Sequence, residues 1–275
     1  MNITHYDLFA GIGGFSLALE EVFNEAKINH IFCEWEHFPS AVLKKHWPNG
    51  IFYGDIADLV DDTNGQGHKS SVAEEQNPTI LTGGFPCQPF SQAGRRKGTA
   101  DDRYQWPNMF RVIQNVKPDW IIAENVRGLV TWNEGMVLEQ VCADLESEGY
   151  EVQPFIIPAC AVNAPHRRDR VWIIAHTEDK RNRAGFREIQ GEDGEVPKRD
   201  DDAKPGYPNW RRDWRKVAIA TCNARMDDGF SREVDGVSYS FAKWRNGSIK
   251  AYGNAIVPQV AMEIFRVIKR IVNVN

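Results

Sequence analysis

The chain has 275 residues, of which 42% are hydrophobic and 26% charged, and its formal net charge is −5. This composition allows a sizeable core and provides no global basic field that would attract nucleic acid or an anionic membrane. No stretch reaches the roughly 18 apolar residues of a membrane-spanning helix, and the first residues lack the features of a signal peptide, so we expect a cytoplasmic protein.

The predicted elements alternate between strands and helices along most of the chain. An apolar run at residues 3–10 predicts a first strand that ends in the turn Gly11-Ile-Gly-Gly14, and the spacing that follows predicts a helix from Phe15 to Phe23. Further strands are predicted at 30–34, 51–53, 80–82, 120–123, 152–157 and 171–175, and further helices at 39–46, 109–116, 137–149 and 259–272. This alternation is typical of an α/β fold with a largely parallel sheet.

Residues 176–247 differ in composition from the rest of the chain. They are rich in charge, glycine and asparagine, have few periodic apolar runs and carry nearly equal numbers of basic and acidic residues. The aromatic residues Tyr207, Trp210 and Trp214 are interleaved with arginine. Such a stretch suits either a solvated, loop-rich insertion or a nucleic-acid surface.

The glycine turn after the first strand is a place where a nucleotide-like cofactor can bind. Small residues let the backbone approach a ligand at the carboxyl end of a strand. The spacing here is Gly11-x-Gly13-Gly14, and Ser16 replaces the third glycine of the dinucleotide fingerprint G-x-G-x-x-G. This departure disfavours NAD and FAD, and the turn taken alone is also consistent with a plain tight turn.

Two acidic residues lie where the second and third strands are predicted to end. Glu34 can accept hydrogen bonds from both hydroxyls of a ribose, the neighbouring Trp35 can stack on adenine, and Asp55 can accept from the adenine amino group. Together they suit an adenosine that needs no phosphate contact, which favours S-adenosylmethionine over a dinucleotide. Each residue taken singly would be interpreted as an ordinary surface residue.

Cys87 stands apart from the other cysteines, which are Cys33, Cys142, Cys160 and Cys222. The five are widely spaced and form no Cys-x-x-Cys pair, which predicts neither a disulfide framework nor a structural zinc site. Cys87 lies between Pro86 and Pro89 in a polar loop, which is a poor place to bury a thiol. Because Glu124 follows the next predicted strand, we expect it at the same sheet edge, where a nucleophile and an acid form a catalytic pair.

Five motifs resemble, in this order, those of the DNA (cytosine-5) methyltransferases. They are Asp7-Leu-Phe-Ala-Gly-x-Gly-Gly-Phe15, Pro86-Cys-Gln88, Glu124-Asn-Val126, Arg168-Asp-Arg170 and Gly253-Asn254-Ala255. The resemblance covers residues 3–175 and 248–275. It implies a catalytic domain at 1–175 and 248–275, built as a Rossmann-like methyltransferase sheet flanked by helices, and a small target-recognition domain at 176–247.

The resemblance implies methyl transfer from S-adenosylmethionine to C5 of a cytosine flipped out of double-stranded DNA. Cys87 would add to C6 as the thiolate, Glu124 would engage N3 and the exocyclic amine, and Arg168 and Arg170 would hold the base. The cofactor residues that it implies are Phe9, Gly11, Gly13, Gly14, Glu34, Trp35, Asp55, Ile56, Pro86, Trp106 and Asn254. Without the resemblance, Phe9 and Trp106 suit core packing equally well. The implied chemistry needs no metal.

The expected partner is double-stranded DNA and the expected form is a monomer; whether a separate cognate restriction endonuclease accompanies it is left open. The tRNA-methylating branch of the family carries a Cys-Phe-Thr tripeptide, whereas here Glu124-Asn-Val126 is followed by Arg127-Gly-Leu-Val130. The intact Cys87 and Glu124 argue against a catalytically idle DNA-binding module. The glycine spacing argues against a nicotinamide oxidoreductase.

Overall fold

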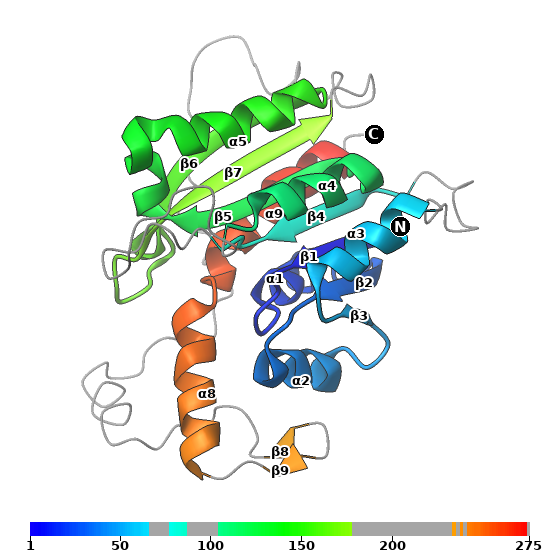
Figure 1. The fold of residues 1–275 in the computed structure, drawn as a ribbon, viewed down its shortest axis with the longest axis vertical. Coiled ribbons are helices and arrows are strands. Elements are labelled where there is room, and N and C mark those ends of the chain that lie inside the picture. The colour runs from blue at the N-terminus through cyan, green and yellow to red at the C-terminus, as the bar shows by residue number, and fades with distance from the viewer. Residues whose placement is uncertain (66–76, 87–103, 178–232, 235–236, 239–240, 274–275) are drawn as a thin grey trace, which may run out of the picture.

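A seven-stranded sheet forms the centre of the molecule (Figure 1). The computed structural model describes residues 1–65, 77–86, 104–177, 233–234, 237–238 and 241–273. The strands are β1 (Asn2–Leu8), β2 (Lys27–Cys33), β3 (Ile51–Tyr53), β4 (Thr79–Gly83), β5 (Trp120–Val126), β6 (Tyr150–Pro158) and β7 (Asp169–Thr177). Their order is β3-β2-β1-β4-β5-β7-β6, and within this sheet β7 alone runs antiparallel to its neighbours. The predicted α/β fold with a largely parallel sheet is confirmed.

Helices cover both faces of the sheet and create two apolar cores (Figure 1). One face carries α1 (Gly14–Val22) and α9 (Pro258–Asn273), and the other carries α3 (Ile56–Gly65), α4 (Trp106–Val116) and α5 (Met136–Ser147). The amphipathic pattern explains the docking of α9, because Val260, Ile264, Phe265, Ile268 and Ile271 recur every three or four residues and all are buried.

The remaining described elements lie beside or below the sheet. They are α2 (His37–His46), α8 (Phe241–Asn254), the short strands β8 (Glu233–Val234) and β9 (Val237–Ser238), and 3-10 helices at Arg127–Val130, Trp132–Gly135 and Ala159–Val162. Helix α8 extends below the sheet and contacts α2, since Gly247 lies against the ring of Phe38 and Lys250 pairs with Glu36 at 2.7 Å (Figure 1). No helix in the described part of the chain is long and apolar enough to span a membrane.

Three features of the structure differ from the sequence-based expectation by more than a shift of strand or helix ends. β5 extends to Val126, so Glu124 lies inside the strand and not after it, because the reversed β7 pairs with β5 as far as the pair Val126 and Arg170. Helix α3 was not predicted, since it is short and carries the weak helix formers Asp, Asn and Gly. Helix α8 crosses the predicted domain boundary at 247–248. Most of 176–247 lies outside the described residues, so the two-domain division remains a prediction.

Strand register brings the ends of five strands to one edge of the sheet. Leu8 of β1 is the partner of both Cys33 and Gly83, Cys33 is the partner of Tyr53, and Gly83 is the partner of Ala123. The residues that come next in each strand or loop are therefore neighbours along this edge: Phe9, Glu34, Gly54, Gly84 and Glu124. The strand order reverses between β1 and β4, and open α/β sheets bind ligands at such a switch point.

A buried polar cluster lies between the sheet and α1, directly below the glycine turn. Its members are His5, Asp7, Ser16, His30 and Thr82, all less than a tenth exposed. Ser16 Oγ and Thr82 Oγ1 donate to the two carboxylate oxygens of Asp7, at 2.8 and 3.1 Å. Thr82 Oγ1 also lies 2.9 Å from Nε2 of His5, and Nδ1 of His5 lies 3.0 Å from Nδ1 of His30, whose Nε2 faces Glu20 at 3.2 Å. Because two ring nitrogens face each other, at least one of them carries no proton, so the two imidazoles cannot both be charged.

The buried polar cluster makes the stability of the fold depend on pH. Burial, and to a smaller extent His30, hold the pKa of His5 well below its ordinary value of 6.5, whereas burial raises the pKa of Asp7 to about 7. The stability that comes from a neutral His5 is present above pH 6.5 and is lost as the pH falls below it. The contribution of Asp7 has the opposite sign, because its proton favours the folded state until the pH rises through about 7.

His5→Gln should destabilise the protein at neutral pH, and this cost should shrink by about 1.4 kcal/mol for each pH unit below 6.5. Urea unfolding of both proteins between about pH 7.5 and about pH 5.5 measures the effect. His166→Gln, at an exposed histidine, should show a constant difference from wild type. A pH-independent cost of His5→Gln would contradict the prediction.

Candidate active site

The glycine turn between β1 and α1 has one glycine that faces open space and two that pack against protein. Gly11 has φ +56°, and a Cβ added there would meet no atom within 4 Å. A Cβ on Gly13 would lie 2.5 Å from the ring of Trp47, and one on Gly14 would lie 2.7 Å from Ile256. Gly13 and Gly14 are therefore required by close packing, and Gly11 is the one that a ligand can approach.

Glu34 holds this turn in place. Its Oε2 accepts the N–H of Gly11 at 2.8 Å, and its Oε1 accepts the N–H of Glu36 at 2.7 Å. Burial raises the pKa of Glu34 above its ordinary value, and the two N–H donors offset part of this rise. A carboxylate has about four acceptor positions, so both oxygens can accept further bonds from a ligand.

Asp55 is the other acidic residue at this edge. The backbone brings it near Glu34, because the N–H of Glu34 donates to the carbonyl of Tyr53 at 3.0 Å, and Tyr53 is two residues before Asp55. Asp55 is exposed and accepts the N–H of Ala57 at 2.9 Å. Trp35 is 82% exposed and offers the ring face that stacking needs. Ile56 is buried in the core, so its expected contact with the cofactor remains a prediction.

Phe9 occupies the last position of this group. It follows β1 directly and has φ +53°, a conformation that costs energy for a bulky residue and is concentrated at functional sites. Its ring is partly buried against the core that carries α4 and α5. Phe9 therefore packs against the core and also lies at the sheet edge where a ligand is expected, so both interpretations of the sequence agree with the structure.

Glu124 is a buried acid that is held by an arginine. It is 9% exposed, and Nε of Arg170 forms an ion pair with its Oε1 at 2.9 Å. Burial raises the pKa of Glu124, and the charges of Arg170 and Arg168 partly offset this rise. An acid of this kind can donate or accept a hydrogen bond when a polar ligand enters.

The loop that leads to Cys87 is fixed against the strand of Glu124. Asn125 Nδ2 donates to the carbonyl of Phe85 at 2.9 Å, and the N–H of Gln105 donates to the carbonyl of Pro86 at 3.1 Å. Cys87 itself lies outside the described residues. No role for Asn125 was predicted, although its place in the motif Glu124-Asn-Val126 was the available signal.

Arg168 contacts the turn that carries Asn254. Its two terminal nitrogens each lie 3.1 Å from the carbonyl of Gly253, and Nη2 also donates to the carbonyl of Ala255 at 2.6 Å. Asn254 is exposed at the end of α8. The guanidinium of Arg168 therefore links the edge that carries Glu124 and Arg170 to the turn before α9, and its expected contact with a base remains a prediction.

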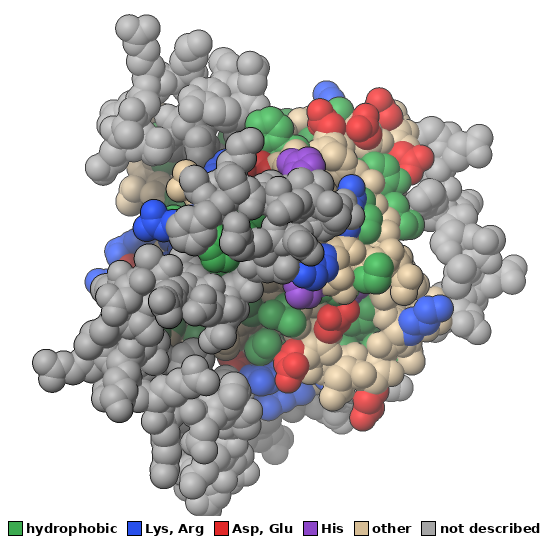
Figure 2. All heavy atoms as spheres, turned by 90° about the horizontal axis from the view of Figure 1, so that it is seen from below, with side chains coloured by type: hydrophobic (Ala, Val, Ile, Leu, Met, Phe, Trp, Pro, Cys, Tyr) green, Lys and Arg blue, Asp and Glu red, His purple; other side chains and the backbone are tan. Residues whose placement is uncertain are grey.

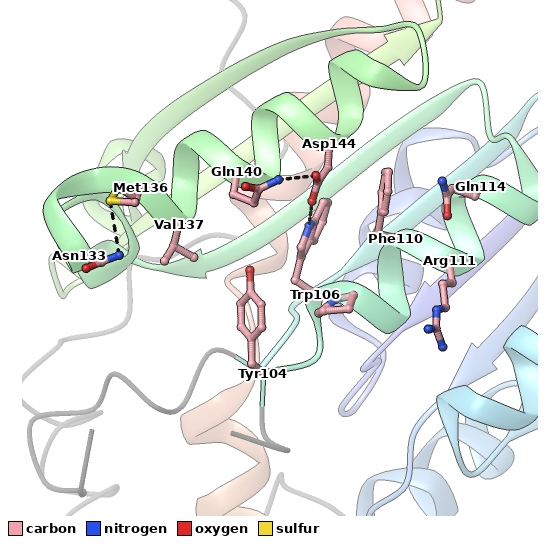
Figure 3. A pocket seen from close by; sticks show the side chains of 11 residues that line it. Tyr104, Trp106, Phe110, Arg111, Gln114, Asn133, Met136, Val137, Gln140 and Asp144 are labelled. Carbon is pink, nitrogen blue, oxygen red and sulfur yellow. Dashed lines mark hydrogen bonds between the residues drawn. The ribbon is translucent and has the colours of Figure 1, made fainter. Parts of the chain in front are cut away.

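Trp106 faces a groove between α4 and α5 (Figure 3). It is 2% exposed, its Nε1 donates to Asp144 on α5 at 2.7 Å, and its ring packs on Phe85 and Phe110. The groove has a volume of about 470 Å³, and of the predicted cofactor residues only Trp106 lines it. The structure therefore gives Trp106 a packing role, and its expected contact with the cofactor remains a prediction.

Comparison with known proteins gives consistent matches. A family model described as C-5 cytosine-specific DNA methylase matches residues 3–228. The Type II methyltransferase M.NlaX of Neisseria lactamica is 32% identical over 170 residues, which are 61% of this chain and 50% of that protein. The Type II methyltransferase M.PspPI of Psychrobacter sp. (strain TA137) is 35% identical over 176 residues, which are 63% of this chain and 39% of that protein.

A solved structure of the methyltransferase EhMeth of Entamoeba histolytica is 17% identical, covers 65% of this chain and 54% of that chain, and has a TM-score of 0.49. The chain spans half or less of the length of the two Type II methyltransferases named above.

Proposed function

Because the chain belongs to the family of C-5 cytosine-specific DNA methylases, we propose that it transfers a methyl group from S-adenosylmethionine to C5 of a cytosine in double-stranded DNA. The relatives named above are Type II methyltransferases, which favours a modification enzyme of a restriction system, with a cognate endonuclease as a separate partner.

One observation carries the proposal: a buried acid paired with an arginine lies at the sheet edge where the strand ends meet, beside the segment that leads to Cys87. Glu124 is 9% exposed, and a Cβ on Gly84 would lie 3.5 Å from Glu124 Oε2. Gly84 is three residues before Cys87. A pyrimidine bound beside Glu124 would therefore lie next to the segment that precedes Cys87.

The residues then have complementary roles in the reaction. The Cys87 thiolate adds to C6 of the extruded cytosine, which forms an S–C6 bond and makes C5 nucleophilic. Glu124 donates a proton at N3, because burial raises its pKa, and so stabilises the charge that develops on the ring. Once C5 has gained the methyl group, with S-adenosylhomocysteine as the leaving group, the C5 proton leaves to water, N3 returns its proton to Glu124, and the S–C6 bond breaks, which restores the thiolate. Arg170 keeps Glu124 oriented through their ion pair.

The residues at the ends of β2 and β3 fit S-adenosylmethionine. This cofactor supplies an electrophilic methyl group when bound. Glu34 offers two carboxylate oxygens to the ribose, the exposed Trp35 offers a stacking face to adenine, and Asp55 retains an oxygen for the adenine amino group. The open approach to Gly11 leaves room for the rest of the molecule.

Incubation with S-adenosylmethionine labelled in its methyl group, and with duplex DNA or tRNA, tests the proposal. We expect label in duplex DNA as 5-methylcytosine and none in tRNA. Label in tRNA would favour the RNA branch of the family, and no transfer to either, with cofactor bound, would contradict an enzymatic role.

Glu34→Gln should weaken binding of S-adenosylmethionine about tenfold or more. Charge-assisted hydrogen bonds are worth roughly 1.5–3 kcal/mol each, and an amide cannot replace both acceptors. Calorimetric titration without DNA measures the change. Glu21→Gln, at an exposed residue of α1, serves as the control.

A cofactor analogue that lacks both ribose hydroxyls separates two roles of Glu34. If Glu34 binds the ribose, wild type should bind the analogue more weakly than S-adenosylmethionine. Glu34→Gln should then bind the analogue almost as well as wild type binds it. An equal further loss in Glu34→Gln would mean that the carboxylate acts only through its bond to Gly11.

A further inference from the structure

Two exposed arginines share one carboxylate at the edge of the sheet. Nη1 of Arg127 lies 2.7 Å from Oδ2 of Asp169, and Nε of Arg167 lies 3.0 Å from Oδ1 of the same residue. The arginine side chains are 59% and 76% exposed, whereas that of Asp169 is 11% exposed. A nearly buried acid therefore orients two guanidinium groups that point to solvent.

This arrangement flanks the candidate active site. Arg127 follows β5 directly, three residues after Glu124, and Arg167 lies three residues before Arg170. Strand pairing joins the two segments, because Val126 is the register partner of Arg170 and Arg170 forms the ion pair with Glu124. The two exposed arginines thus lie on the chain segments that immediately adjoin the buried acid.

The charge and donor count of this group suit an anion with several oxygens. Two guanidiniums against one carboxylate leave one positive charge in excess. Each guanidinium has five N–H donors and donates one of them to Asp169, which leaves about four for a ligand. Because Asp169 already restricts both side chains, less conformational entropy is lost when they bind. Acidic and basic side chains are interspersed among the described residues on the face in Figure 2, so a local group of this kind matters more than a general basic surface.

We propose that Arg127 and Arg167, oriented by Asp169, bind the phosphodiester groups of the DNA strand on either side of the extruded cytosine. The inference rests on the proposed function, since it places the two arginines at the entrance of the same site. Their contacts fix the position of the strand and carry no sequence information. Asp169 is a positioning residue in this arrangement.

Fluorescence anisotropy of a labelled duplex, measured over a series of KCl concentrations, tests whether Arg127 and Arg167 bind DNA phosphates. Arg127→Gln and Arg167→Gln should each lower the slope of log K against log salt by about 0.9, and the double variant by about 1.8. Each single variant should bind about tenfold more weakly at ~0.1 M salt. The loss should be larger for a duplex with the recognised sequence than for one without it, because only the former presents an extruded cytosine. The dissociation constant of S-adenosylmethionine, measured by calorimetry, should not change.

Two further sets of variants keep the test decisive. Arg127→Lys and Arg167→Lys retain the charge and should retain most of the salt slope, whereas Arg266→Gln, which removes an arginine paired with Glu263 on α9, should leave it unchanged. The proposed phosphate contacts would be overturned if the glutamine variants kept the wild-type salt slope, or if the lysine variants lost as much of it as the glutamine variants, while wild type still methylated DNA. A wild-type protein that neither binds nor methylates duplex DNA would overturn the proposed function instead.

Discussion

Cys87→Ser is expected to lower the rate of methyl transfer at least about a thousandfold, because a neutral hydroxyl is a far weaker nucleophile for C6 than a thiolate. Binding of S-adenosylmethionine should be unchanged, since the proposed ribose and adenine contacts, Glu34, Trp35 and Asp55, lie at the ends of β2 and β3. The measurement is the single-turnover rate of label transfer to duplex DNA, together with calorimetry of the cofactor. Normal turnover by Cys87→Ser would exclude this residue as the nucleophile.

The chain offers a matched control, because Cys160 is an exposed cysteine to which the proposed mechanism gives no role. Cys160→Ser should methylate DNA at the wild-type rate. Duplex DNA with 5-fluorocytosine at the target adds a direct readout, because fluorine cannot leave as a proton does and elimination stalls. Wild type and Cys160→Ser should form a covalent adduct visible on a denaturing gel, and Cys87→Ser should form none.

Glu124→Gln is expected to lower the rate of methyl transfer by a factor on the order of a hundred or more, the range of a positioned general acid. The amide keeps the volume of the side chain but cannot donate a proton to N3 in the same way. It also leaves the charge of Arg170 without its partner at 2.9 Å, so some loss of stability is expected as well. Single-turnover rates at saturating DNA and cofactor isolate the chemical step.

Two comparisons separate catalysis from folding in this variant. Glu146→Gln, at an exposed residue of α5, should keep the wild-type rate. Cofactor affinity and the midpoint of thermal unfolding show whether Glu124→Gln is folded under the assay conditions. A folded Glu124→Gln protein with a wild-type rate would remove the acid from the mechanism.

The sequence by itself determined the fold class and the candidate chemistry. Alternating apolar patterns located all seven strands of the sheet to within a few residues, because strand and helix periods depend on nearest neighbours in the chain. The motifs that carry Glu34, Asp55 and Glu124 each lie at or near a strand end, and in a parallel sheet these ends meet at one edge. Their grouping at this edge therefore follows from the order of strands and helices along the chain.

The tertiary structure decided which of these side chains a ligand can reach and what state they are in. Gly13 and Gly14 pack against Trp47 and Ile256, Trp106 turns to Asp144, and Arg168 donates to the carbonyls of Gly253 and Ala255. These contacts join residues far apart in the chain.

The charge states of the buried groups likewise depended on the tertiary structure. The raised pKa of Glu124 and the lowered pKa of His5 follow from burial and from charged partners on other strands. No local sequence pattern specifies these, because desolvation and side-chain direction depend on how the elements pack.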